Sequence, residues 1–142
     1  MTPQEQLVKT VAEAWGHADL QPLYAALDDN VVWKSAASSW NDKLRSGGTH
    51  EGRANVIALF SKVQTAFFNQ GCTAKEIVSR GDVVWGLFDV RSSYAPTKDR
   101  NTARKDLAGE MVLRMRIRDG KIIEGQTFFD TAALLRELSS TA

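Results

Sequence analysis

Two residues, Asp130 and His50, have the chemistry and the setting of a catalytic acid or base. Asp130 directly follows the strand-like run 121–129, and a carboxylate there, beside an apolar site, can exchange protons with a ligand carbonyl. It also precedes a helix-like run over 131–138, and the capping preference slightly favours a role as the N-cap of that helix, although both roles could coexist. His50 ends a long irregular stretch, 34–50, and an imidazole at a pocket mouth could act as a general acid or base near neutral pH. The competing interpretation of His50 is a solvated loop histidine.

Large apolar side chains suited to enclosing a flat hydrophobic ligand are plentiful. The predicted ligand-binding set is Trp33, Trp40, Phe60, Trp85, Phe88, Tyr94, Met111 and Phe128. Plain core packing is the alternative, and it is favoured for Phe60, which lies on a regular helical stripe. Trp40 has no periodic reason to be buried, which indicates a lid or an interface. Within this set, Tyr94 or Trp33 would orient the ligand.

The sequence offers little support for metal, cofactor or nucleophilic chemistry. The two histidines are far apart in sequence, and no Cys/His cluster has ligand spacing. There is no Gly-rich phosphate loop and no Gly-x-Ser-x-Gly turn, and no base can be paired with Cys72. The net charge of +1 gives no reason to expect nucleic acid or an anionic membrane as a partner. We therefore expect no metal and no cofactor.

Length and cysteine content narrow the class of protein. A chain of 142 residues fits one domain over 1–142 and can bury a core without staples. The single cysteine excludes an internal disulfide and is typical of a reducing compartment. No apolar run approaches the ~20 residues that span a bilayer, and the first residues lack a secretion signal. A cytoplasmic location is the expectation.

Helical signals dominate the first half of the chain. Thr2, Pro3 and Glu5 form the pattern of a capping box that begins a helix. A second helix over 20–27 would be capped by Asp19, followed by a turn at 28–30 and a strand at 31–33. A third helix is predicted at roughly 53–69, with Gly71 to stop it.

Strand signals dominate the second half. A short run at 77–78 closes at Gly81-Asp82, and longer runs follow at 83–94, 107–118 and 121–129. The last two flank Asp119-Gly120, a strong two-residue hairpin signal. A polar loop over 95–105 and a closing helix over 131–138 complete the pattern. Helices segregated from an antiparallel sheet indicate an α+β fold.

Several strings, taken in order, resemble the SnoaL-like and ketosteroid-isomerase-like branch of the nuclear-transport-factor-two-like superfamily. They are Leu23-Tyr24, Asp28-Asp29-Asn30-Val31-Val32-Trp33, Gly52-Arg53, Asp119-Gly120-Lys121-Ile122 and Phe128-Phe129-Asp130. The resemblance implies a cone-shaped domain in which three N-terminal helices pack on a strongly curved, antiparallel or mixed sheet. A short C-terminal helix and a mostly apolar small-molecule pocket complete that expectation.

The resemblance also bears on the reaction. Steroid isomerases of this superfamily have an aspartate base at the position of Lys34 and a protonated acid near Leu113, and neither residue here can replace them. The paired carboxylates and arginine of the epoxide hydrolases cannot be assigned either. Asp130, however, is similar in place to the pocket acid/base of SnoaL-like cyclases.

Two hypotheses follow from these observations. The first is a cofactor-independent acid/base enzyme of isomerase, cyclase, dehydratase or hydrolase type, acting on a hydrophobic carbonyl compound through Asp130 with His50 as helper. The second is a non-catalytic domain that binds a lipophilic ligand or serves in dimeric association. In either case the stripe Arg114, Arg116 and Arg118 predicts a subunit-facing sheet surface, because sheet-face dimers are common among the proteins that this chain resembles.

Overall fold

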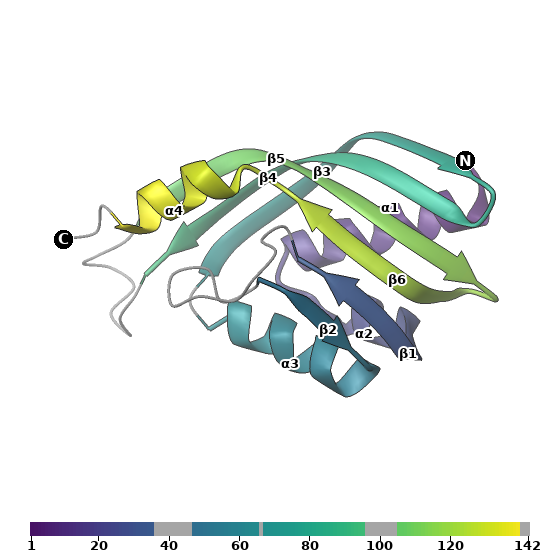
Figure 1. Ribbon diagram of the computed structural model, residues 1–142. Helices are drawn as coiled ribbons and strands as arrows, with labels where there is room; N and C mark the ends of the chain where they lie inside the picture. The colour runs from purple at the N-terminus through teal and green to yellow at the C-terminus, as the bar shows by residue number, and fades with distance from the viewer. Residues whose placement is uncertain (36–46, 66, 96–104, 140–142) are drawn as a thin grey trace.

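One curved sheet, with three helices against one of its faces, makes up the body of the protein (Figure 1). The computed structural model describes residues 1–35, 47–65, 67–95 and 105–139. The helices are α1 (Pro3–Gly16), α2 (Gln21–Ala26), α3 (Arg53–Val63) and α4 (Thr131–Ser139). The strands are β1 (Leu27–Lys34), β2 (Thr49–Glu51), β3 (Phe67–Arg80), β4 (Val83–Tyr94), β5 (Lys105–Arg118) and β6 (Lys121–Phe128). The α+β expectation is confirmed.

The sheet is mixed, with the strand order β2-β1-β6-β5-β4-β3. Only the β1–β6 pair among these neighbours is parallel, and the long strands β3, β4 and β5 form an antiparallel meander. Asp119 and Gly120 both have positive φ, 51° and 74°, as the hairpin between β5 and β6 requires. The β1–β6 pairing brings the first strand of the chain beside the last.

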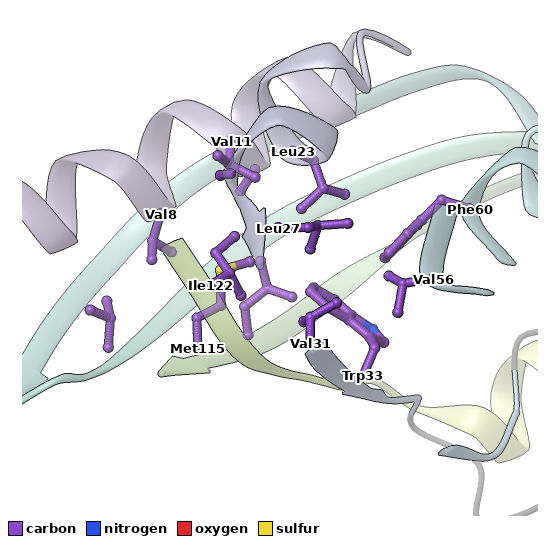
Figure 2. Packing of buried hydrophobic residues seen from close by; sticks show 14 of the residues in the cluster. Val8, Val11, Leu23, Leu27, Val31, Trp33, Val56, Phe60, Met115 and Ile122 are labelled. Carbon is purple, nitrogen blue, oxygen red and sulfur yellow. The ribbon is translucent and has the colours of Figure 1, made fainter. Parts of the chain in front are cut away.

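The core lies between the sheet and helices α1–α3 (Figure 2). On α1, Val8, Val11 and Ala12 are fully buried, and the capping box predicted at Thr2 and Glu5 is present. Strand alternation supplies the opposite side: Met111, Leu113, Met115 and Ile117 of β5 are all buried. We call the sheet face that carries these side chains the inner face and the opposite one the outer face.

Two segments differ from the expectation. The predicted third helix ends at Val63 rather than near Asn69, and β3 begins at Phe67. A run that keeps helical spacing to Phe67 is extended there because it pairs along the length of β4, from Phe67 opposite Tyr94 to Arg80 opposite Val83. Long-range strand pairing outweighs the local pattern.

The other differences lie around β1. The predicted turn at 28–30 is an irregularity inside the strand: its register against β6 shifts between Leu27 and Val32, and the Asn30 amide donates to Asp28 Oδ2 at 2.9 Å. Part of the predicted loop 34–50 is the short strand β2, which pairs with β1.

Candidate functional site

Four residues of the predicted ligand-binding set lie together inside the fold. Trp33 and Phe88 are fully buried, and Phe60 and Met111 are almost so. All four belong to one hydrophobic cluster. Phe88 and Met111 are directly paired across β4 and β5, and Figure 2 shows Trp33 beside Phe60. The expected group of apolar side chains therefore exists, built from α3 and the inner face.

Trp33 is the centre of this group. Its ring lies edge-on to Phe60, with the centroids 5.0 Å apart, and Phe60 has the same relation to Trp15 of α1 at 4.9 Å. Gly125 of β6 pairs with Trp33, and a Cβ atom at Gly125 would overlap the indole ring. The indole Nε1 atom is buried and has no hydrogen-bond partner among the described residues. In Figure 2 the nitrogen lies on the edge of the ring away from Met115 and Ile122.

His50 lies beside Trp33. It is the middle residue of β2 and pairs directly with Trp33 across the antiparallel ladder, so both side chains point to the same face. The ring is half-buried, and its Nε2 atom lies 3.0 Å from the Gly47 carbonyl oxygen. The short strand β2 therefore holds this imidazole beside the buried indole.

Asp130 is placed differently. Its Oδ1 atom accepts from the Ala133 amide at 2.9 Å and its carbonyl accepts from Leu134 at 3.1 Å, so it is the N-cap of α4. The side chain is exposed. His50 pairs with Trp33, which pairs with Gly125 of β6, and Phe128 ends β6 three residues later. The backbones of His50 and Phe128 are therefore two strand spacings and three residues apart, which is roughly 14 Å. The sequence admitted both roles for Asp130, and the structure shows the cap.

Trp85 and Phe128 lie on the opposite face of the sheet from Trp33, which corrects the expectation that one cavity collects the whole set. Both are on the outer face, 42% and 41% exposed, because alternation along β4 and β6 turns them away from Phe88 and Gly125. Their rings stack at 6.3 Å with 18° between the planes, and Arg114 Cζ lies 5.9 Å from the Trp85 centroid.

The remaining two members of the set have separate outcomes. Tyr94, at the end of β4, is half-buried and contacts the ring of Phe67 at 5.3 Å. It lies on the inner face, because Phe88 is six residues earlier on the same strand. Trp40 falls in 36–46, outside the described residues.

Two further buried polar side chains, those of Gln64 and Gln70, were not predicted from the sequence. Gln64 follows the last turn of α3, and its Nε2 atom is buried without a partner among the described residues. Gln70 of β3 has a buried Oε1 atom in the same condition. A glutamine at the end of a helix or near the start of a strand looks like a surface residue in sequence, so no signal marked either one.

Several charged side chains of the outer face form ion pairs. Arg116 bridges Asp82 and Glu124 at 2.6 and 3.3 Å, Arg114 also contacts Glu124, and Arg118 contacts Asp82. Partial burial of Asp82 and Glu124 opposes ionisation, but the arginine hydrogen bonds and charges outweigh it and hold the pKa of both carboxyls below the ordinary value. The arginine stripe is thus part of an ion-pair network.

Other chemistry finds little support in the described part of the chain. Burial, helped by the negative charge of Glu13, raises the pKa of the Cys72 thiol to about 12, so this cysteine stays protonated and unreactive. Across the described ranges, no three His, Cys, Asp or Glu side chains gather to hold a metal ion. No described helix is long and apolar enough to cross a membrane.

A surface cleft of about 590 Å³ lies outside the cluster, at the start of α3. Its lining is Asp29, Gly52, Arg53, Ala54, Asn55 and Ile57. None of these was in the predicted set, and no aromatic side chain is among the described residues of this lining. The cleft therefore does not have the character of the predicted pocket.

Comparison with known proteins places these features in a family. The family model for the SnoaL-like domain matches residues 8–125. No curated protein matches the chain.

Solved structures give the same fold at low sequence identity. A Burkholderia pseudomallei protein of unknown function, described as NTF2-like, is 24% identical with a TM-score of 0.79, over 99% of this chain and 100% of that one. TerC, co-crystallised with polyporic acid, is 20% identical with a TM-score of 0.78, over 98% and 100%. A Jannaschia protein described as a SnoaL-like polyketide cyclase is 16% identical with a TM-score of 0.79, over 99% and 96%.

Proposed function

The chain belongs to the SnoaL-like domain family, and from this premise we propose that it binds a hydrophobic, carbonyl-bearing small molecule against Trp33, between the sheet and α3. The observation that carries the proposal is the indole N–H of Trp33, a buried donor without a partner among the described residues. Buried polar groups are almost always hydrogen-bonded, and an unpaired donor costs about 1–3 kcal/mol. A ligand carbonyl oxygen would satisfy it.

The surroundings of Trp33 support an apolar ligand. Phe60, Phe88 and Met111 are neutral and buried, and binding sites for small molecules combine such a lining with a few polar groups that fix orientation. TerC was crystallised with polyporic acid, and the Jannaschia protein is described as a SnoaL-like polyketide cyclase. These names support a flat carbonyl compound as the ligand class.

Ligand capture is favoured over acid/base catalysis by Asp130. The carboxylate caps α4 and is exposed, whereas the chemistry proposed for it needs a group facing an apolar site. A second candidate function, catalysis through His50, is favoured by one observation: the direct pairing of His50 with Trp33. An imidazole at that position would lie close to a carbonyl held by the indole.

Calorimetric titration of two probes with one carbon skeleton tests the binding proposal. We expect 1-tetralone to bind about fivefold or more tightly than tetralin, since one net hydrogen bond contributes about 1 kcal/mol. Trp33→Phe keeps an aromatic ring but removes the donor, so it should reduce this preference by about fivefold while tetralin still binds. Trp15→Phe, which alters the other neighbour of Phe60, is the matched control and should keep the preference. Equal binding of both probes to the wild type would contradict the proposal.

We also propose that the outer face joins two copies of the chain. Val78, Trp85 and Phe128 are exposed large apolar residues, 55%, 42% and 41%, and Val78 pairs with Trp85 while Trp85 stacks on Phe128. Both signs of charge border them: Lys75 with Asp89 and Glu110, and Arg114 with Glu124. A patch that carries both signs around an apolar centre is suited to self-association about a twofold axis.

A further inference from the structure

Three buried polar atoms lack hydrogen-bond partners among the described residues, and they come from three separate elements. They are Nε1 of Trp33 in β1, Nε2 of Gln64 after α3, and Oε1 of Gln70 in β3. The first two are donors and the third is an acceptor. Each group is costly to bury unpaired, so three in one small domain require an explanation.

The first two atoms have a common neighbour, Phe60. The Trp33 ring packs on the Phe60 ring at 5.0 Å. Phe60 and Gln64 are four residues apart at the end of α3, where the Gln64 amide still donates to the Phe60 carbonyl at 3.1 Å. Side chains at this spacing lie one above the other on one helix face. The indole ring of Trp33 and the side-chain amide of Gln64 are therefore both neighbours of the Phe60 ring.

Gln70 is directed inward by an irregularity in β3. Between Phe68, opposite Ser93, and Gly71, opposite Arg91, two residues of β3 stand against Ser92 alone. Such a bulge changes the direction of a side chain without ending the ladder. Alternation then places Gln70 on the face of Cys72, which belongs to the core cluster. Phe67, at the start of β3, adds the contact with Tyr94 on this face.

We infer that Trp33, Gln64 and Gln70 form the polar recognition set of one chamber, selective for a neutral, flat ligand that carries both a carbonyl and a hydroxyl group. This inference rests on the proposed small-molecule binding and names the ligand class. Trp33 and Gln64 donate to the two lone pairs of the carbonyl oxygen, and Gln70 accepts from the hydroxyl group. The three groups are uncharged, so an anionic ligand would lose its hydration without gaining a counter-charge from them.

Four probes with one carbon skeleton separate the three contacts: tetralin, 1-tetralone, 6-hydroxytetralin and 6-hydroxy-1-tetralone. The proteins are the wild type, Gln64→Met, Gln70→Met and the control Gln126→Met. Methionine keeps the length of glutamine without its hydrogen bonds. Gln126 is a half-buried glutamine of the outer face, opposite Arg114, and matches the other two in type.

We expect the wild type to bind the hydroxyketone most tightly, about 100-fold or more over tetralin, as three net hydrogen bonds imply. Gln64→Met should reduce the preference for 1-tetralone over tetralin by about fivefold. Gln70→Met should remove the preference for 6-hydroxytetralin and leave that for the ketone unchanged. Gln126→Met should change neither preference.

Thermal unfolding of the ligand-free proteins gives a second readout. Replacement of an unpaired buried amide by an apolar side chain should raise the melting temperature for Gln64→Met and Gln70→Met, and leave it unchanged for Gln126→Met. Wild-type preferences retained in both variants would overturn the recognition set but leave ligand binding intact. Failure of all four probes to bind the wild type would overturn the proposed function and this inference together.

Discussion

The two faces of the sheet differ in whether their polar side chains have bonding partners within the described fold. On the outer face, Arg116 is bonded to both Asp82 and Glu124, so ions there find partners within the fold. On the inner face, the Trp33 indole is buried among apolar rings without a partner among the described residues. The charged side chains of the outer face stabilise the fold through ion pairs with one another. On the inner face, the indole N–H is a hydrogen-bond donor without an acceptor among the described residues. A few unpaired polar groups in an apolar lining are typical of a small-molecule binding site, and this difference between the two faces can be tested.

The largest effect is expected from crowding the inner face. Gly125→Ala would place a methyl group inside the volume of the Trp33 ring, and we expect a loss of about 3 kcal/mol in the free energy of unfolding. Gly109→Ala in β5 is the control, because no atom lies within 4 Å of the added Cβ. It should change stability by about 0.5 kcal/mol or less. Urea unfolding measures both, and equal effects would contradict the packing described for Trp33.

The next effect concerns the exposed apolar patch of the outer face. Trp85→Glu should raise the dimer dissociation constant by about 30-fold or more, since a central tryptophan of an interface contributes about 2 kcal/mol. Ala58→Glu introduces the same charge on an exposed position of α3 and should leave the dimer intact. Sedimentation velocity distinguishes the two. A wild type that is monomeric at high concentration would refute the self-association proposal.

A smaller effect concerns the acid stability of the outer-face ion pairs. The pKa of Asp82 is lowered in the folded state, so its contribution is present above the unfolded pKa and is lost as the pH falls through the folded value. Asp82→Asn should therefore be less stable than the wild type at pH 7, and the difference should shrink below about pH 4. Asp29→Asn, an exposed carboxylate on the helix side, is the control. A constant difference across pH would argue against the ion-pair origin.

The smallest effect is expected at Asp130. Asparagine caps a helix about as well as aspartate, so Asp130→Asn should change stability by only a few tenths of a kcal/mol and leave probe binding unchanged. Asp130→Ala should cost about 1 kcal/mol through loss of the cap. A large loss of ligand binding or turnover in Asp130→Asn, at normal stability, would restore the acid/base hypothesis.

Sequence periodicity predicted most of the fold because local signals agreed with long-range pairing. The alternation through Met111, Leu113 and Met115 predicted the buried side of β5, and Asp119-Gly120 predicted its hairpin. The sequence predicts a third helix that is too long, because the spacing to Phe67 is helical. The pairing with Tyr94 that decides the conformation is 27 residues away in sequence.

The candidate site was predictable only in part. Residue type alone marks large aromatic side chains as candidates for a ligand site, but the sheet face that each one occupies depends on strand register. The sequence therefore groups Trp85 and Phe128 with Trp33, although they lie on the other face of the sheet. Gln64 and Gln70 matter only through burial, which follows from packing and from a bulge. Neither feature leaves a mark in a single sequence.

The most direct test of the central claim is the ¹⁵N-resolved resonance of the Trp33 indole N–H during titration with 1-tetralone and with tetralin. The protein has four tryptophans, and substitution to phenylalanine assigns each signal. The account predicts that 1-tetralone moves the Trp33 indole proton downfield, that tetralin moves it much less, and that the exposed Trp85 signal responds to neither. A Trp33 signal that responds equally to both probes, or a response confined to Trp85, would contradict it.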